Sequence, residues 1–125
     1  MRHDTLADMF SSLKNKESIG KKECIVPYSR LIESVLKVIG KNKYIGDFHK
    51  TEDGNITIKL IGRINRCSVI KPRFSVKKED FIKFEKRYLP ARNVGILIVT
   101  TPDGIMDQKE AVKKGTGGAL LGYVY

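Results

Sequence analysis

Two short polar segments near the carboxyl end carry the residue types best suited to binding a polar ligand. Thr100–Gly104 has the sequence Thr-Thr-Pro-Asp-Gly, and Gly115–Gly118 has the sequence Gly-Thr-Gly-Gly. Proline and glycine favour tight turns, because proline fixes φ and glycine adopts backbone angles that other residues avoid. Such turns hold hydroxyls and backbone N–H groups in fixed positions, which suits hydrogen bonding to sugar and phosphate oxygens. Turns that only hold a sheet together have the same composition, so that interpretation stays open.

The segments around the two turns have the signals of strands and of a short helix. Asp107 and Glu110 have the spacing of an N-cap and its capping-box partner, and Gly115 stands where a helix-ending glycine belongs. The apolar run Ile96–Val99 is typical of a strand buried on both faces, and the alternation over Ala119–Tyr125 indicates a final strand. We therefore expect two strands and a helix of about two turns to hold the polar segments in place.

The residues in and around these turns resemble a known family. The stretch Gly95–Asp107, together with Glu110-Ala111 and Thr116–Gly118, closely resembles the signature of the eighth small-subunit ribosomal protein. Upstream, Asn65–Val76 and Leu89–Arg92 resemble the archaeal and eukaryotic branch of that family. The similarity covers nearly the whole chain.

The chain also departs from the bacterial members of this family. They have Ser-Lys where this chain has Pro102-Asp103, and glutamate where it has Ala119. RNA contacts that depend on those side chains in the bacterial members are therefore not expected in this chain. Contacts made by the backbone and by the threonines are still expected.

The resemblance implies a structural, non-enzymatic protein of the small ribosomal subunit. It implies direct binding to a central-domain helix of 16S-type rRNA, mainly through the C-terminal module, in support of subunit assembly and translation. The implied partners are small-subunit rRNA and neighbouring ribosomal proteins, with the protein's own mRNA as a further RNA ligand. We expect no cofactor, no metal and no membrane partner, a cytoplasmic location within the small subunit, and a monomer when free.

Expected RNA contacts come from the two turns, from a basic corner and from two helix starts. Lys71 and Arg73 flank Pro72, which can lie only at a bend or sheet edge, so they are expected at an exposed corner. Ser29 can cap a helix whose N-terminus attracts anions, although a capped core helix is the alternative. The expected RNA-binding residues are Thr100, Thr101, Pro102, Asp103, Gly104, Thr116, Gly117, Gly118, Lys71, Arg73, Asp4, Thr5, Ser29 and Arg30.

The first helix start rests on the segment Asp4–Met9, which is similar to the family's opening helix. Leu6, Met9, Phe10 and Leu13 recur at helical spacing and predict an amphipathic helix. A core helix without ligand contacts has the same pattern. In either case Asp4 is better suited to capping the helix than to touching phosphate.

The charge is unevenly distributed. The 125-residue chain has 24 Lys+Arg against 14 Asp+Glu, a formal net charge of +10, which favours a polyanionic partner such as nucleic acid. Residues 63 to 92 hold 10 basic against 3 acidic residues, whereas residues 93 to 125 hold 3 against 3. We therefore expect electrostatic attraction to come mainly from the central basic segment, and selectivity from the neutral turns.

The chain is predicted to be an α+β protein of two small modules. Residues 1–64 have the pattern helix, strand, helix, strand, strand, with a hairpin around Glu52–Asn55. Residues 65–125 have the pattern of a mainly β, RNA-binding module with short helices. At 125 residues and 41% hydrophobic content, the chain supports one compact domain or two modules that share an interface.

Other functions have weaker support in the sequence. A threonine nucleophile at Thr100 or Thr101 would need a base, and His3 and His49 are remote in sequence. Cys24 and Cys67 lack metal-site spacing, so buried free thiols are expected. A DNA-binding module would need a recognition helix, for which no segment rich in Arg and Asn is present.

Overall fold

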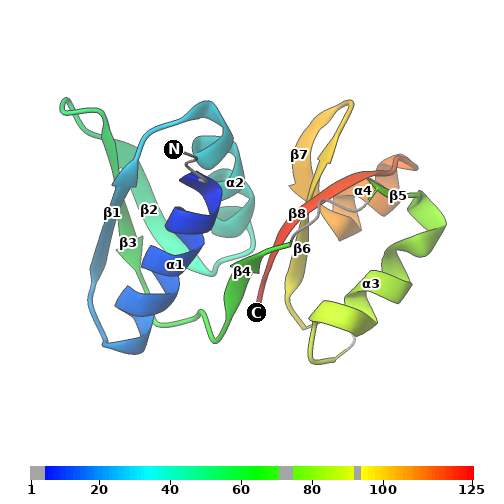
Figure 1. Ribbon diagram of the computed structural model, residues 1–125, viewed down its shortest axis with the longest axis horizontal. Helices are drawn as coiled ribbons and strands as arrows, with labels where there is room; N and C mark the ends of the chain where they lie inside the picture. Colours follow the sequence, from blue (N-terminus) through cyan, green and yellow to red (C-terminus); the bar gives the residue numbers. More distant parts are fainter. Residues whose placement is uncertain (1–4, 71–74, 92–93) are drawn as a thin grey trace.

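The computed structural model describes residues 5–70, 75–91 and 94–125 (Figure 1). The helices in these residues are α1 (Thr5–Ser18), α2 (Arg30–Lys41), α3 (Phe81–Tyr88) and α4 (Gln108–Lys114), with a 3-10 turn, η1, at Lys78–Asp80. The strands are β1 (Glu23–Pro27), β2 (Ile45–Lys50), β3 (Asn55–Leu60), β4 (Cys67–Val69), β5 (Ser75–Val76), β6 (Ile96–Thr101), β7 (Gly104–Asp107) and β8 (Gly118–Val124).

The strands form two antiparallel sheets. The first sheet has the order β1-β3-β2, and the second has the order β4-β8-β6-β7 with β5 also paired to β8. All strands of the first sheet precede those of the second in the sequence. The α+β fold class is therefore confirmed, with the element order α-β-α-β-β in the first half and a mainly β second half.

The elements are arranged in layers across the long axis of the molecule (Figure 1). The first sheet lies at one end, α1 and α2 follow, the second sheet comes next, and α3 and α4 cover its far side. Strand β6 explains this order, because Ile96 and Ile98 belong to one hydrophobic cluster while Leu97 and Val99 belong to the other. Successive side chains of a strand point to opposite faces, so this continuous apolar run is buried on both faces, as predicted.

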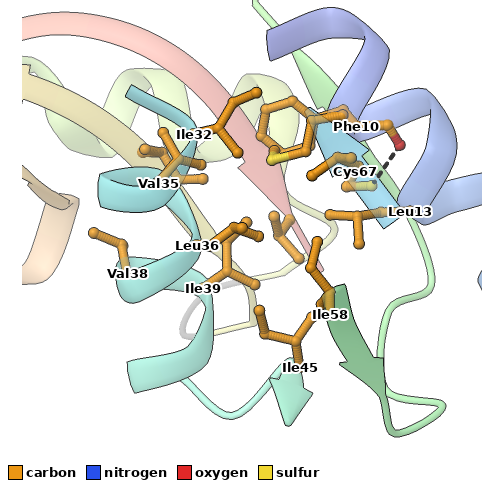
Figure 2. Packing of buried hydrophobic residues seen from close by; sticks show 14 of the residues in the cluster. Phe10, Leu13, Ile32, Val35, Leu36, Val38, Ile39, Ile45, Ile58 and Cys67 are labelled. Atoms are coloured by element: carbon orange, nitrogen blue, oxygen red, sulfur yellow. Dashed lines mark hydrogen bonds between the residues drawn. The ribbon is translucent and has the colours of Figure 1, made fainter. Parts of the chain in front are cut away.

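The larger hydrophobic cluster lies between the two sheets. In Figure 2, Ile32 and Leu36 of α2 face Phe10 of α1 and Ile58 of the first sheet. These side chains are at most 1% exposed, and burying each stabilises the fold by about 1.5–3 kcal/mol. The same cluster includes Cys67 and residues of β6 and β8, so it crosses from residues 1–64 into residues 65–125.

Two elements differ from the sequence prediction. The segment Gly104–Asp107, expected to connect a turn to a helix, forms strand β7 on the edge of the second sheet. Helix α1 continues to Ser18, five residues beyond Leu13, which is the last residue of the predicted amphipathic pattern. The last turn of α1 is held by tertiary contacts, because the Glu17 carboxylate accepts hydrogen bonds from the backbone N–H groups of Gly62 (3.2 Å) and Ile64 (2.9 Å).

Candidate nucleic-acid interface

The first polar segment forms the turn between β6 and β7. Pro102 and Asp103 lie at its tip, and Thr101 pairs with Gly104 across the hairpin. The Thr101 hydroxyl donates to the Gly104 carbonyl (2.8 Å) and accepts from the Asp103 N–H (3.1 Å). Since the hydroxyl proton is used inside the turn, Thr101 offers a ligand only its remaining acceptor capacity. Gly104 has a φ of 120°, which favours glycine.

The second polar segment follows helix α4. The Asp107 carboxylate caps this helix by accepting from the Glu110 N–H (2.8 Å), as predicted. Gly115 ends the helix in the left-handed region at a φ of 68°, also as predicted, and the Thr116 N–H donates to the Ala111 carbonyl (3.0 Å). These bonds fix the direction in which the chain leaves α4 and enters β8.

The pairing of β6 with β8 brings the two segments together. Thr100 lies directly opposite Ala119 in the register, although 19 residues separate them in the sequence. Gly118 packs so closely against β6 that a Cβ atom there would lie 2.1 Å from the Thr100 carbonyl oxygen. We name the surface formed by residues 100–104 and 116–118 the signature ridge.

The signature ridge is polar, and it carries little charge. Pro102, Asp103 and Gly104 are exposed, whereas the ridge threonines, Gly117 and Gly118 are half-buried. Asp103 is its one ionisable residue, and Asp107 behind it is 6% exposed and acts as a helix cap. The ridge therefore presents hydroxyls and backbone amides rather than an acid–base pair, which suits hydrogen bonding to a shaped polar surface.

The remaining predicted site residues either lie outside the two turns of the ridge or fall outside the described residues. Ser29 is the N-cap of α2, because its hydroxyl accepts from the Ile32 N–H (3.1 Å), and exposed Arg30 follows it. Thr5 is exposed at the start of α1. Asp4, Lys71 and Arg73 lie outside the described residues. The register thus joins the two turns, while Thr5, Ser29 and Arg30 sit at the N-terminal ends of the first two helices.

The sequence did not reveal how the end of α2 supports the ridge. The Asn42 side-chain amide donates to the Asp107 carboxylate (3.0 Å) and to the Val38 carbonyl (2.9 Å). Glu110 pairs with Lys41 (3.4 Å), so its carboxylate is directed toward α2. Asn42 and Asp107 are 65 residues apart, and no spacing rule relates them.

Both cysteines are free and buried, in agreement with the sequence prediction. Burial raises the pKa of the Cys67 thiol to about 12 and also raises the pKa of Cys24. Within residues 5–70, 75–91 and 94–125, no group of three or more His, Cys, Asp or Glu side chains could hold a metal ion. In the same residues, no helix is long and apolar enough to cross a membrane.

Comparisons with known proteins identify the family. Residues 4–125 match the family described as ribosomal protein S8. The small ribosomal subunit protein uS8 of Methanococcoides burtonii is 51% identical over 126 residues, which cover 98% of this chain and 97% of the relative. The resemblance stated from the sequence is thereby confirmed, as is the prediction of a structural protein rather than an enzyme. The chain belongs to the ribosomal protein S8 family.

Proposed function

We propose that this protein is a structural component of the small ribosomal subunit that binds rRNA directly through the signature ridge. The observation that carries the proposal is the β6–β8 register, which sets the turn after β6 beside the turn before β8. Family membership and the name of the uS8 relative support the assignment to the small subunit. The net charge of +10 supports a polyanionic partner.

A neutral ridge of hydroxyls and amides suits the minor groove of an RNA helix. That groove is wide and shallow and displays 2′-hydroxyls, whereas the major groove is too deep and narrow for side chains to reach base edges. A ridge held by internal hydrogen bonds would recognise the shape of the groove, with little ordering on binding. The RNA ligand is therefore a folded helix, with cations elsewhere on the protein contacting its phosphates. The family resemblance implies that this helix belongs to the central domain of small-subunit rRNA.

The proposal extends to partners and organisation. We propose that neighbouring ribosomal proteins contact this chain in a cytoplasmic small subunit, that its own mRNA is a second RNA ligand, and that the free protein is a monomer. We also retain the division into residues 1–64 and a C-terminal RNA-binding module at 65–125. The sheets support this division, since their strands fall on either side of residue 64, although the larger hydrophobic cluster spans both parts.

The variant Thr100→Val tests the ridge, because it removes a hydroxyl while keeping the branched shape of the side chain. Thr57→Val is the matched control, since Thr57 is also a half-buried threonine on a strand but belongs to the first sheet. We expect Thr100→Val to weaken binding to a central-domain rRNA fragment by about 1 kcal/mol without changing the salt dependence, because no charge is lost. Equal affinity of the two variants, with no loss of footprint at the protected nucleotides, would contradict the proposed ridge.

A further inference from the structure

An open groove lies between helix α1 and strand β4, and its lining includes no residue of the signature ridge. Its volume is about 380 Å³, and its lining residues are Ala7, Phe10, Ser11, Lys14, Cys67, Ser68 and Val69. The two sides of the groove come from opposite halves of the sequence. The Cys67 thiol donates to the Phe10 carbonyl (3.5 Å; Figure 2). This contact spans 57 residues and joins the two sides of the groove.

The polar groups that line this groove suit an anionic, oxygen-rich ligand. Ser11 supplies a hydroxyl, Lys14 supplies an ammonium group, and no carboxylate is among the lining residues. The Ser68 hydroxyl donates to the Val69 carbonyl (3.2 Å), so it offers a ligand only its acceptor capacity. Lys14 is exposed and forms no ion pair within the described part of the chain. A cation without a partner beside two hydroxyls matches a phosphate and its sugar better than it matches a cation or an apolar peptide.

Strand β4 adds backbone groups to the same side. Arg66 and Tyr125 exchange two backbone hydrogen bonds (2.9 and 2.8 Å), and the Ile70 N–H donates to the Leu121 carbonyl (2.9 Å). Hydrogen-bonding direction alternates along an antiparallel strand, so the N–H and C=O groups of Cys67 and Val69 point away from β8. β4 is an edge strand in the described sheet, and the outward N–H groups of Cys67 and Val69 lie beside the groove, whereas the Val69 carbonyl accepts from the Ser68 hydroxyl (3.2 Å).

The floor of the groove is neutral and apolar. Phe10 is 1% exposed and Cys67 is 4% exposed. Because burial raises the pKa of Cys67 to about 12, its thiol stays protonated and is neither a nucleophile nor a metal ligand near neutral pH. The floor can therefore contact the carbon atoms of a sugar, while the polar rim binds its oxygens.

We propose that the groove between α1 and β4 is a second RNA-backbone site, which binds one phosphate and the adjoining ribose. In this arrangement Lys14 pairs with the phosphate and the Ser11 hydroxyl donates to a phosphate oxygen. The Ser68 hydroxyl oxygen, whose proton is donated to the Val69 carbonyl, accepts from the ribose 2′-hydroxyl. The inference rests on the proposed RNA-binding function and adds to it a contact that spans the two halves of the chain. Residues 1–64 and residues 65–125 would then contact the same RNA, and the two contacts together would fix the orientation of the protein on that RNA.

The variants Lys14→Gln and Lys16→Gln test the proposal as a matched pair. Both lysines are exposed on α1, but only Lys14 lines the groove. For a small-subunit rRNA fragment, a lost phosphate contact reduces the slope of log affinity against log salt by about 1. We expect this reduction and a severalfold weaker affinity near 0.1 M salt for Lys14→Gln, and a slope close to that of the unmodified protein for Lys16→Gln. Equal slopes for the two variants would overturn the proposal.

Phosphate-ethylation interference with the same RNA locates the contact. We expect one phosphate at which ethylation weakens binding of the unmodified protein but not of Lys14→Gln. If both proteins show the same interference pattern, the groove does not hold RNA backbone, including the case in which a neighbouring protein occupies it. A thermal unfolding midpoint for Lys14→Gln that matches the unmodified protein verifies that the fold is intact, as expected for an exposed position.

The groove proposal and the ridge proposal can be contradicted independently of each other. If Thr100→Val loses affinity while Lys14→Gln behaves like Lys16→Gln, the ridge proposal stands and the groove proposal is wrong. If Lys14→Gln loses its phosphate contact while Thr100→Val binds normally, the groove proposal stands and the ridge proposal is wrong.

Discussion

At the scale of single residues, Gly118 of the signature ridge has no room for a side chain. A Cβ atom there would lie 2.1 Å from the Thr100 carbonyl oxygen and 2.9 Å from its carbonyl carbon, both backbone atoms that cannot rotate away. We expect Gly118→Ala to separate β8 from β6 locally, which would lower the free energy of unfolding by about 1–3 kcal/mol. The same shift would move the two turns apart and weaken RNA binding. Urea unfolding and RNA titration measure the two effects.

Gly54→Ala is the control for this prediction. Gly54 lies in the hairpin between β2 and β3, with a φ of 82° and nothing within 4 Å of an added Cβ, so its substitution strains the backbone without a clash. This variant should lose stability as well, but it should keep the RNA affinity of the unmodified protein. If Gly118→Ala also binds RNA normally, the spacing of the two turns is not what the RNA recognises.

At the scale of elements, the end of α2 supports the beginning of α4. Asn42 bonds to the Asp107 carboxylate, and the other oxygen of that carboxylate caps α4. We expect Asn42→Ala to lower the free energy of unfolding by about 1–3 kcal/mol, because a 6% exposed carboxylate loses a hydrogen-bond donor. RNA affinity should fall too, since α4 leads into the second turn of the ridge. Chemical denaturation and RNA titration are the measurements.

Lys41→Ala provides the comparison for Asn42→Ala. It removes a 3.4 Å ion pair between the same two helices, in which the Lys41 and Glu110 side chains are 66% and 33% exposed. An exposed ion pair contributes at most about 1 kcal/mol, so we expect little change in unfolding or in RNA binding. Similar losses in the two variants would indicate that any contact between α2 and α4 is sufficient and that the buried carboxylate has no special role.

The elements that the sequence predicted are those with strong local signals. Ser29 and Asp107 cap helices, Gly115 ends one, and the apolar run of β6 is buried on both faces, as their residue types indicate. Strand β7 was missed because its four residues begin with the turn residue Gly104 and end with the helix cap Asp107, and so short a segment shows no period. The β6–β8 register and the Asn42 contact were also out of reach, since long-range packing rather than local spacing determines them. The turns that form the ridge could be predicted from the sequence, but the long-range contacts that support them could not.

At the scale of the whole molecule, the charge distribution predicts that affinity and selectivity for RNA come from different parts of the chain. Residues 63 to 92 hold 10 basic against 3 acidic residues, whereas residues 93 to 125, which include the ridge, hold 3 of each. We expect Arg73→Gln to reduce the salt slope of RNA binding by about 1 and to weaken cognate and unrelated RNAs alike, because a phosphate contact carries no sequence information. Lys59→Gln removes the same charge from an exposed position in the first sheet and should leave the slope unchanged.

The measurement is RNA affinity at several salt concentrations, for a central-domain fragment and for an unrelated hairpin. An Arg73→Gln variant that keeps its salt slope, or that weakens only the cognate RNA, would show that the basic segment does not act as a general phosphate-binding surface.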